Sequence, residues 1–230
     1  MAPSLKAALE DLLRARRLQA ESPPLRGERR LYPLGTGVAT LDALLGGGFP
    51  RGQVSEVYGP SSSGRTGLLL SLVARVTRGG ALGAWVDAAD RLDPASALSA
   101  GVDLGRLLWL RGGRAVSESL SGAATLLGSG LFELVVLDLA GAPEKDVGRL
   151  PGTTWLRLQR MIEASTTAFV LLGNHHTAHG PAGVSLAMSP AKPFWSGHPG
   201  PGRLFQGLST DVRVGRHGFR TTPLELPAAH

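Results

Sequence analysis

Short apolar runs alternate with segments of helical periodicity along the middle of this 230-residue chain, and this alternation constrains the fold more than any other feature. We predict strands over residues 53–58, 81–87, 107–110, 134–139 and 168–173. The helical segments cover residues 66–78, 93–100, 116–127 and 154–164. Strands joined by helices in units of this length form a parallel sheet that is covered on both faces. We therefore predict an α/β fold with a mostly parallel, twisted sheet flanked by helices.

The N-terminal segment differs from this alternating region. Residues 3–19 carry apolar side chains at spacings of three and four, which is typical of an amphipathic helix. The charged and proline-containing residues 21–30 then predict a linker. We divide the chain into an N-terminal helix (1–20), a linker (21–30) and a core (31–230). The apolar stripe of the helix needs a partner surface, either on its own core or on another chain, so self-association stays open.

The C-terminal third has a different composition from the alternating region. Glycine, proline, serine and histidine dominate residues 174–203, which predicts a long loop within the core that is either functional or disordered. Residues 208–214 and 219–226 flank a glycine-containing turn and predict a β-hairpin. We expect this appended hairpin to extend the sheet.

Composition excludes several classes of site. The chain has no cysteine, which rules out a disulfide framework, a thiolate zinc site, an iron–sulfur cluster and a cysteine nucleophile. It contains neither the ~20 apolar residues of a membrane span nor the pattern of a secretory signal, so we expect a cytoplasmic protein without membrane contacts. The formal charge is +6, and only three of the 24 basic residues are lysines. An arginine-rich, weakly basic chain suits nucleic acid, although we favour codon usage as the explanation for the arginines.

A glycine-rich sequence, GPSSSGRT, lies between the first predicted strand and the first predicted helix. In this context it matches a phosphate-binding loop, in which backbone N–H groups and a helix N-terminus surround a phosphate. Lysine is expected where Arg65 stands, and arginine is a longer, planar group. The candidate nucleotide contacts are Gly59, Ser61, Ser62, Ser63, Gly64, Arg65, Thr66 and Asp138. The alternative is a glycine-rich turn that serves packing alone.

Asp138 directly follows the apolar run 134–137. A carboxylate at the carboxyl end of a buried strand can orient magnesium beside a phosphate loop. We therefore predict that Thr66 and Asp138 ligate magnesium, on the condition that nucleotide binds. Taken alone, Asp138 fits equally well as the cap of the turn through Gly141.

Several motifs together resemble the core of bacterial RecA recombinases. These are residues 34–42 (LGTGVATLD), 45–52 (LGGGFPRG), 56–64 (EVYGPSSSG), 86–88 (VDA), 92–94 (LDP) and 101–104 (GVDL). Within this RecA-like superfamily the chain is similar to the short ImuA-type proteins, which are accessory factors of mutagenic translesion synthesis with eroded nucleotide sites. The resemblance implies a role in DNA repair and the SOS response.

Two departures from the RecA pattern affect the expected chemistry. Arg65 replaces the family's lysine, and Ala89 stands where the resemblance places the glutamate that polarises the attacking water. An alanine cannot act as a base, so we predict no catalytic residue and only weak or absent binding of ATP and magnesium. Rescue by Asp87 or Asp90 is the alternative. The resemblance also places a polar sensor of the γ-phosphate at Asn174 or His175.

The resemblance further implies that a DNA-contacting loop begins near residue 174. The candidate DNA-binding residues are Lys192, Trp195, Arg203, Arg213 and Arg216. A disordered loop and a docking surface for a protein are the competing interpretations. His175, His176 and His179 lie within five residues, and we weigh a structural metal site there against a polar loop with neutral imidazoles, which we favour.

These observations favour a RecA-like accessory protein of translesion DNA synthesis that acts as a polymerase-partner scaffold with a degenerate nucleotide site. The implied partners are an ImuB-type translesion polymerase subunit and a replicative-type polymerase, with RecA, single-stranded DNA and a second copy of the chain as further candidates. The alternative is an active RecA-like, DNA-dependent ATPase that remodels recombinase filaments.

Overall fold

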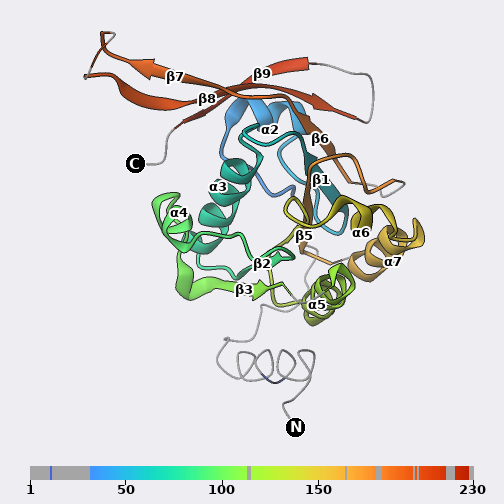
Figure 1. The fold of residues 1–230 in the computed structure, drawn as a ribbon. Coiled ribbons are helices and arrows are strands. Elements are labelled where there is room, and N and C mark those ends of the chain that lie inside the picture. Colours follow the sequence, from blue (N-terminus) through green and yellow to red (C-terminus); the bar gives the residue numbers. More distant parts are fainter. Residues whose placement is uncertain are drawn as a thin grey trace.

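The fold is shown in Figure 1 as a computed structural model. It describes residue 11 and residues 32–112, 115–163, 165–179, 183–198, 200, 202–215 and 221–227. The expected N-terminal helix and linker lie outside these described residues, except for Asp11, so the divisions at residues 20 and 30 stay predictions. Among the described residues, none of the helices has both the length and the apolar character needed to cross a membrane.

The described residues form one nine-stranded sheet in the order β3-β2-β4-β5-β1-β6-β8-β7, with β9 also paired to β8. The strands are β1 (Val54–Tyr58), β2 (Gly83–Asp87), β3 (Leu107–Arg111), β4 (Leu134–Asp138), β5 (Ala168–Gly173), β6 (Ser185–Met188), β7 (Lys192–Ser196), β8 (Leu204–Val214) and β9 (Thr221–Pro227). The pairs from β3 to β6 are parallel, whereas β8 runs antiparallel to β6, β7 and β9. The predicted α/β class with a mostly parallel sheet is confirmed.

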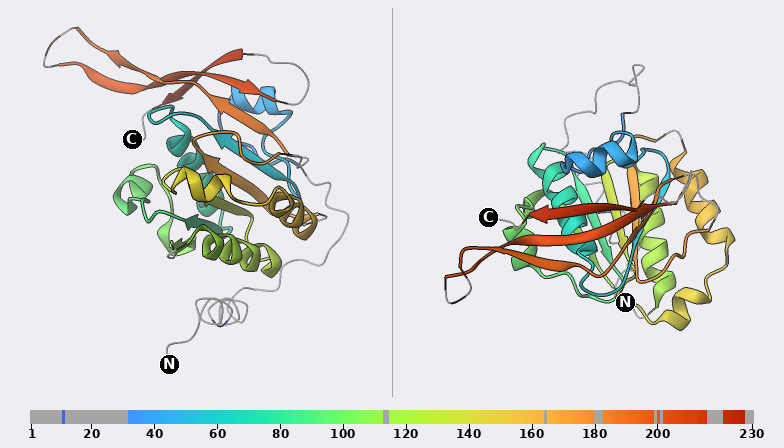
Figure 2. Two further views of the ribbon diagram at one scale, coloured as in Figure 1. Left: turned by 45° about the vertical axis from the view of Figure 1, so that its right-hand side comes forward. Right: turned by 90° about the horizontal axis from the view of Figure 1, so that it is seen from above.

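Helices cover both faces of the sheet (Figures 1 and 2). They are α2 (Ala39–Leu45), α3 (Arg65–Arg78), α4 (Pro94–Ser99), the 3-10 helix η1 (Leu104–Arg106), α5 (Val116–Ser129), α6 (Glu144–Gly148) and α7 (Thr153–Ile162). Their packing follows from the alternation of side chains along a strand. Val136 of β4 belongs to the core under α2, α3 and α4, whereas its neighbours Val135 and Leu137 belong to the core under α5 and α7.

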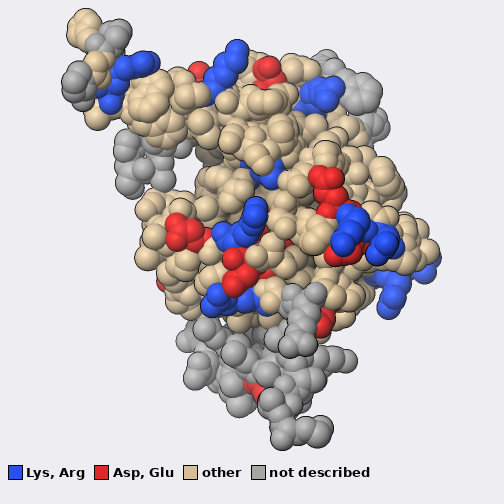
Figure 3. All heavy atoms as spheres, viewed as in Figure 1, with Lys and Arg blue, Asp and Glu red and all other residues tan. Residues whose placement is uncertain are grey.

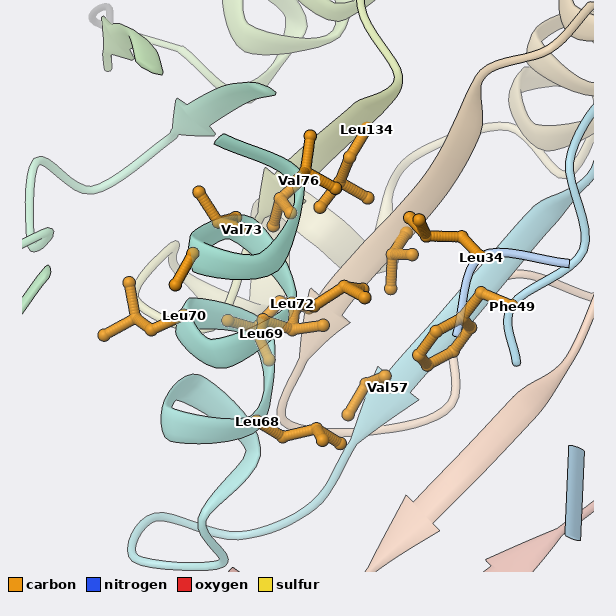
Figure 4. Packing of buried hydrophobic residues seen from close by; sticks show 14 of the residues in the cluster. Leu34, Phe49, Val57, Leu68, Leu69, Leu70, Leu72, Val73, Val76 and Leu134 are labelled. Atoms are coloured by element: carbon orange, nitrogen blue, oxygen red, sulfur yellow. The ribbon is translucent and has the colours of Figure 1, made fainter. Parts of the chain in front are cut away.

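The core on the α3 face is the one that positions the phosphate loop. Figure 4 shows Leu68, Leu69 and Leu72 of α3 directed toward β1 and the neighbouring strands. All three leucines are fully buried, as is Val57 of β1. Burying a leucine side chain contributes about 1.5–3 kcal/mol, so this contact fixes the start of α3 relative to the end of β1. The loop that joins them is held at both ends.

One part of the sequence-based prediction is wrong. Residues 174–203 do not form one open loop, because β6 and β7 lie within this segment and β8 begins at Leu204 rather than at residue 208. Leu186 and Met188 of β6 are buried, and β6 pairs with β1 on one side and β8 on the other. The short segment Ser185–Met188 gains its strand conformation from these distant partners. Glycines and prolines flank this segment, so its sequence surroundings are typical of a loop and not of a strand.

Candidate nucleotide-binding site

The phosphate loop connects β1 to α3 at the carboxyl end of the parallel strands, as predicted. Two residues of the loop adopt positive φ angles, Ser62 at 62° and Gly64 at 86°. Gly64 caps α3, and glycine accepts this backbone conformation without strain. The side chain of Ser63 is fully buried, whereas Ser61, Ser62 and Thr66 are exposed.

The loop is seated on the C-terminal strands, which the sequence did not predict. A Cβ atom added to Gly59 would lie 2.3 Å from the carbonyl oxygen of Met188, and one added to Gly64 would lie 2.8 Å from Cδ1 of Leu226. The backbone N–H of Ala191 also donates to the carbonyl of Ser62 over 3.1 Å. The two loop glycines thus permit close contact with the end of β6 and with β9.

Arg65 is folded back into the loop rather than extended from it. Its Nη1 donates to the carbonyl oxygens of Gly59 and Pro60, and its Nη2 donates to Oδ1 of Asn174 over 2.8 Å. The residue is only 8% exposed, and burial lowers the pKa of its guanidinium while the charge of Asp138 opposes that shift. Within the described residues Nε has no hydrogen-bond partner. The cation at the lysine position is therefore bound by the protein itself.

Asp138 ends β4 beside this group. Its Oδ1 accepts a hydrogen bond from the N–H of Ala140 over 2.9 Å. Asp138 therefore caps the turn that follows β4, which was the alternative role considered for it. Burial raises the pKa of Asp138 to about 6, and the nearby charge of Asp87 acts in the same direction. The Ala140 amide and Arg65 oppose this rise without cancelling it. A carboxyl group with this pKa is a weaker magnesium ligand than an ordinary aspartate, because it holds a proton to higher pH.

Asp87 is the register partner of Asp138 on the adjacent strand β2. Its Oδ2 accepts hydrogen bonds from the N–H of Leu92 (2.7 Å) and from Nε1 of Trp109 (3.3 Å). Its Oδ1 is buried and has no hydrogen-bond partner among the described residues. The ends of β2 and β4 therefore bring two buried carboxyl groups together, a pairing that the separate apolar runs did not reveal.

Ala89 lies in the turn after β2, where the RecA pattern places a glutamate. It is half-buried, and a Cβ atom built on Gly141 would lie 2.6 Å from its Cβ. The carboxylate of Asp90 is exposed, with both oxygens 2.7 Å from the guanidinium of Arg111. Asp90 is thus committed to an ion pair on the neighbouring edge strand, which argues against its substituting for the missing glutamate.

The two candidate sensor residues separate in the structure. Asn174 contacts Arg65, whereas Nε2 of His175 lies 3.1 Å from an exposed carboxylate oxygen of Glu144. Asn174 is therefore the residue brought to the phosphate loop. The sensor role itself stays a prediction.

The other two histidines of the cluster pack around β1. Nδ1 of His176 lies 2.5 Å from Oε2 of Glu56, a buried residue of β1, and Oε1 of Glu56 accepts hydrogen bonds from the N–H groups of Thr177 and Ala178. The rings of His176 and His179 meet edge to face at 4.5 Å. Within the described part of the chain, no group of three or more histidine, cysteine or acidic side chains is placed to hold a metal ion.

The predicted DNA-binding residues are only partly brought together. Trp195 of β7 and Arg203 before β8 meet, with Cζ of Arg203 5.4 Å from the centroid of the indole ring. Lys192 lies at the other end of β7, and Arg213 lies where β8 pairs with β6 and β9. Arg216 lies outside the described residues.

Comparison with known proteins supports the architecture of this site. The sequence profile of the RecA N-terminal domain family matches residues 26–154, which is more than half of the chain. The chain belongs to the RecA N-terminal domain family. The matched region contains the phosphate loop, Ala89 and Asp138, so Arg65 and Ala89 are departures within a shared framework.

Individual relatives carry the same family name. Over 119 residues the chain is 45% identical to the protein RecA of Prochlorococcus marinus strain MIT 9211. The aligned region covers 49% of this chain and 30% of that protein. The chain is 41% identical over 118 residues to the protein RecA of Lactobacillus acidophilus, covering 51% of this chain and 32% of that protein. The match thus spans about a third of the curated relatives' length.

A solved structure of a RadB recombinase has the same fold. It matches with a TM-score of 0.58 and 22% sequence identity, covering 84% of this chain and 93% of that chain. At this identity the likeness concerns the fold alone. It extends beyond the region matched by the family profile, because that profile ends at residue 154.

The residues present fit a magnesium nucleotide poorly. Such a ligand needs a free positive charge at the loop, a threonine hydroxyl and an ionised carboxylate. Thr66 is exposed and available, but Arg65 is engaged with the carbonyls of Gly59 and Pro60, and burial favours the neutral form of Asp138. The site keeps the family's architecture, while the cation at the lysine position is already bound by the loop.

Proposed function

We propose that this RecA-like chain is an accessory protein of translesion DNA synthesis, acting as a scaffold for polymerase subunits rather than as an ATPase. The observation that carries the proposal is the placement of Arg65, whose guanidinium joins the phosphate loop to Asn174 at the end of β5. Charge-assisted hydrogen bonds are roughly twice as strong as neutral ones, so these contacts hold the loop against the end of β5. In this role the loop contributes to a rigid domain and does not need nucleotide to become ordered.

The chemistry of phosphoryl transfer supports the same proposal. An efficient ATPase positions a water molecule and stabilises charge on the transferring group. Ala89 offers no acceptor for a proton from that water, and loss of a general base costs about 10²–10⁴-fold in rate. The guanidinium of Arg65 would have to leave three oxygen acceptors before it could contact a phosphate. These two defects affect different parts of the reaction, so their effects should compound.

The polymerase partners follow from the resemblance to ImuA-type proteins. The proposed partners are an ImuB-type translesion polymerase subunit and a replicative-type polymerase, with RecA as a further candidate. A scaffold needs a stable framework and exposed surfaces, and the nine-stranded sheet with its two buried cores provides the framework. Large exposed side chains such as Leu98 of α4 and Leu156 and Met161 of α7 are available on its surface.

The second candidate is an active, DNA-dependent RecA-like ATPase that remodels recombinase filaments. The intact strand–loop–helix geometry and the exposed Thr66 favour it. Under this alternative, nucleotide would displace Arg65 from the loop carbonyls, and association with partners would depend on ATP.

The test is a titration of the full chain with purified ImuB-type subunit and replicative-type polymerase, with and without magnesium ATP. The proposal predicts a complex that forms without nucleotide and whose Kd changes less than about twofold on addition of ATP. That limit corresponds to a free energy of about 0.4 kcal/mol. A complex that forms only with ATP would favour the filament-remodelling ATPase, and no complex with either polymerase at micromolar concentrations would refute the scaffold.

A further inference from the structure

The three residues that connect β6 to β7 contact the phosphate loop, and we define residues 189–191 as the strap. The backbone N–H of Ala191 donates to the carbonyl of Ser62 over 3.1 Å. The strap begins directly after Met188, whose carbonyl oxygen would lie 2.3 Å from a Cβ atom built on Gly59. The backbone of the loop therefore lies directly against the end of β6 and the strap.

The strap is itself fixed to the sheet. The carbonyl of Ser189 accepts a hydrogen bond from Oγ1 of Thr210 over 2.7 Å, and the N–H of Ser189 donates to the carbonyl of Asp211 over 2.9 Å. Both partners lie on β8, and Thr210 is buried. Pro190 adds a fixed φ angle at the centre of the strap. These contacts leave the strap little freedom to follow a movement of the loop.

Ser62 shows that the loop is held in an unfavourable backbone conformation. Its φ angle is 62°, and among the described residues Asp90 is the only other non-glycine residue with a positive φ. A side chain disfavours this region, because its Cβ comes too close to the following carbonyl oxygen. Such strain persists only where the surrounding structure fixes the backbone. The hydrogen bond from the strap to the Ser62 carbonyl is a contact of this kind.

Arg65 holds the same loop at other atoms. Its guanidinium donates to the carbonyls of Gly59 and Pro60. A phosphate group that drew the guanidinium away would leave these carbonyls without that partner unless the loop backbone rearranged. The close approach of Met188 leaves Gly59 no room to move toward β6, and a movement of Ser62 would break its bond to the strap. The strap therefore raises the cost of opening the loop.

The surrounding charge does not offset this cost. Figure 3 shows basic and acidic side chains interspersed over one face of the described molecule. A broad surface of one sign would draw an anion toward a site, but mixed charges do so weakly. On that face, binding of a phosphate group would depend on contacts within the loop itself.

We propose that the strap is an autoinhibitory element that keeps the phosphate loop closed, with Arg65 bound to its carbonyls. This inference rests on the proposed function, since a scaffold works with its phosphate loop unoccupied. The strap lies outside residues 26–154, the region that the RecA N-terminal domain profile matches. Loosening the strap should increase the fraction of molecules with an open loop, and the apparent affinity for an anion rises with that fraction.

The experiment combines hydrogen exchange at residues 61–64 with a titration of the full chain with inorganic pyrophosphate. Ala191→Pro removes the N–H that bonds Ser62, and Ala191→Gly is the matched control because it keeps that N–H. In Ala191→Pro, loss of one hydrogen bond should accelerate exchange in the loop and tighten the apparent Kd for pyrophosphate about 2- to 12-fold. Ala191→Gly should stay within about twofold of the native chain.

A second variant loosens the strap from its other side. Thr210→Val removes the hydroxyl that bonds the carbonyl of Ser189 and keeps the size of the side chain. It should change loop exchange and pyrophosphate binding in the same direction as Ala191→Pro. Thr210→Ser keeps the hydroxyl and is its control. If circular dichroism shows that Ala191→Pro does not fold, Thr210→Val decides the question.

Three results would overturn the inference. The first is native-like loop exchange and pyrophosphate affinity in the loosened variant. The second is faster exchange without tighter pyrophosphate binding, because the strap would then support the loop without closing it. The third is an equal effect in the control variant, which keeps the hydrogen bond. None of these results concerns the polymerases, so binding of the polymerase subunits by the native chain still tests the scaffold separately.

Discussion

The guanidinium of Arg65, at the start of α3, donates a hydrogen bond over 2.8 Å to the side-chain oxygen of Asn174, just beyond the end of β5. The same guanidinium binds the carbonyls of Gly59 and Pro60 at the other end of the loop. One side chain therefore connects the loop to Asn174, one of the two residues predicted to sense the γ-phosphate. In this arrangement both residues contribute to the folded domain in the absence of nucleotide.

The buried carboxyl group of Asp138 predicts a pH dependence of stability. Its pKa is about 6 in the fold, whereas an aspartate in an unfolded chain titrates near ~3.9. Between these values the folded protein binds more protons than the unfolded chain, so this group's contribution is fully present below pH ~4 and is lost as the pH rises through ~6. Asp138→Asn cannot ionise, and we expect it to be more stable than the native chain at pH 8 by about 1–3 kcal/mol.

Urea unfolding at pH 8 and pH 4 measures this difference. The gain from Asp138→Asn should shrink toward zero at pH 4, where the native carboxyl group is protonated as well. A variant that is less stable than the native chain at pH 8 would show that the attraction between Asp138 and Arg65 outweighs the cost of burial.

The contact between the phosphate loop and β6 predicts the effect of a methyl group at Gly59. In Gly59→Ala the new Cβ would lie 2.3 Å from the carbonyl of Met188, so the loop or the end of β6 must shift. We expect a loss of about 1–3 kcal/mol, as for other overpacked sites. Gly67→Ala is the control, because a Cβ there meets nothing within 4 Å and the position lies inside α3. It should stabilise the chain by about 0.5–1 kcal/mol. Equal unfolding free energies for the two variants would contradict the packing described here.

The contacts of Glu56 should stabilise the segment after β5 locally. The Glu56 carboxylate is 3% exposed and holds His176 and the N–H groups of Thr177 and Ala178. Glu56→Ala leaves these groups unpaired, at a cost of about 1–3 kcal/mol for each buried one. Hydrogen exchange at Thr177 and Ala178 should accelerate. Glu144→Ala removes an exposed pair with His175 and should cost at most about 1 kcal/mol. Unchanged exchange in Glu56→Ala would mean that other contacts hold the segment.

The central part of the fold could be predicted because its signals are local. Strands β4 and β5 are almost entirely apolar and buried. Asp93 with Pro94 marks the start of α4, where the Asp93 side chain accepts hydrogen bonds from Ala95 and Ser96. The short strand β6 has no such signal. Its conformation depends on pairing with β1, which is more than a hundred residues away in the sequence.

Local patterns singled out some residues of the candidate site but not their arrangement. The loop pattern identified Arg65, and an apolar strand with a terminal carboxylate identified Asp138. No local pattern reports that Arg65 turns back onto Gly59 and Pro60, because a sequence motif does not specify a rotamer. The contact of Glu56 with His176 was missed because the two residues are 120 positions apart, and no local pattern links them.

Steady-state phosphate release from ATP tests the central claim most directly. The native chain is compared with Arg65→Lys, which shortens the cation, and with Arg65→Lys combined with Ala89→Glu, which also restores a base. Each is measured with and without single-stranded DNA. We predict that the native chain releases phosphate at least about 100-fold more slowly than the double variant, the lower limit for restoring general-base catalysis. Native turnover as fast as that of the double variant would contradict the account, because Arg65 and Ala89 would then be compatible with an active ATPase.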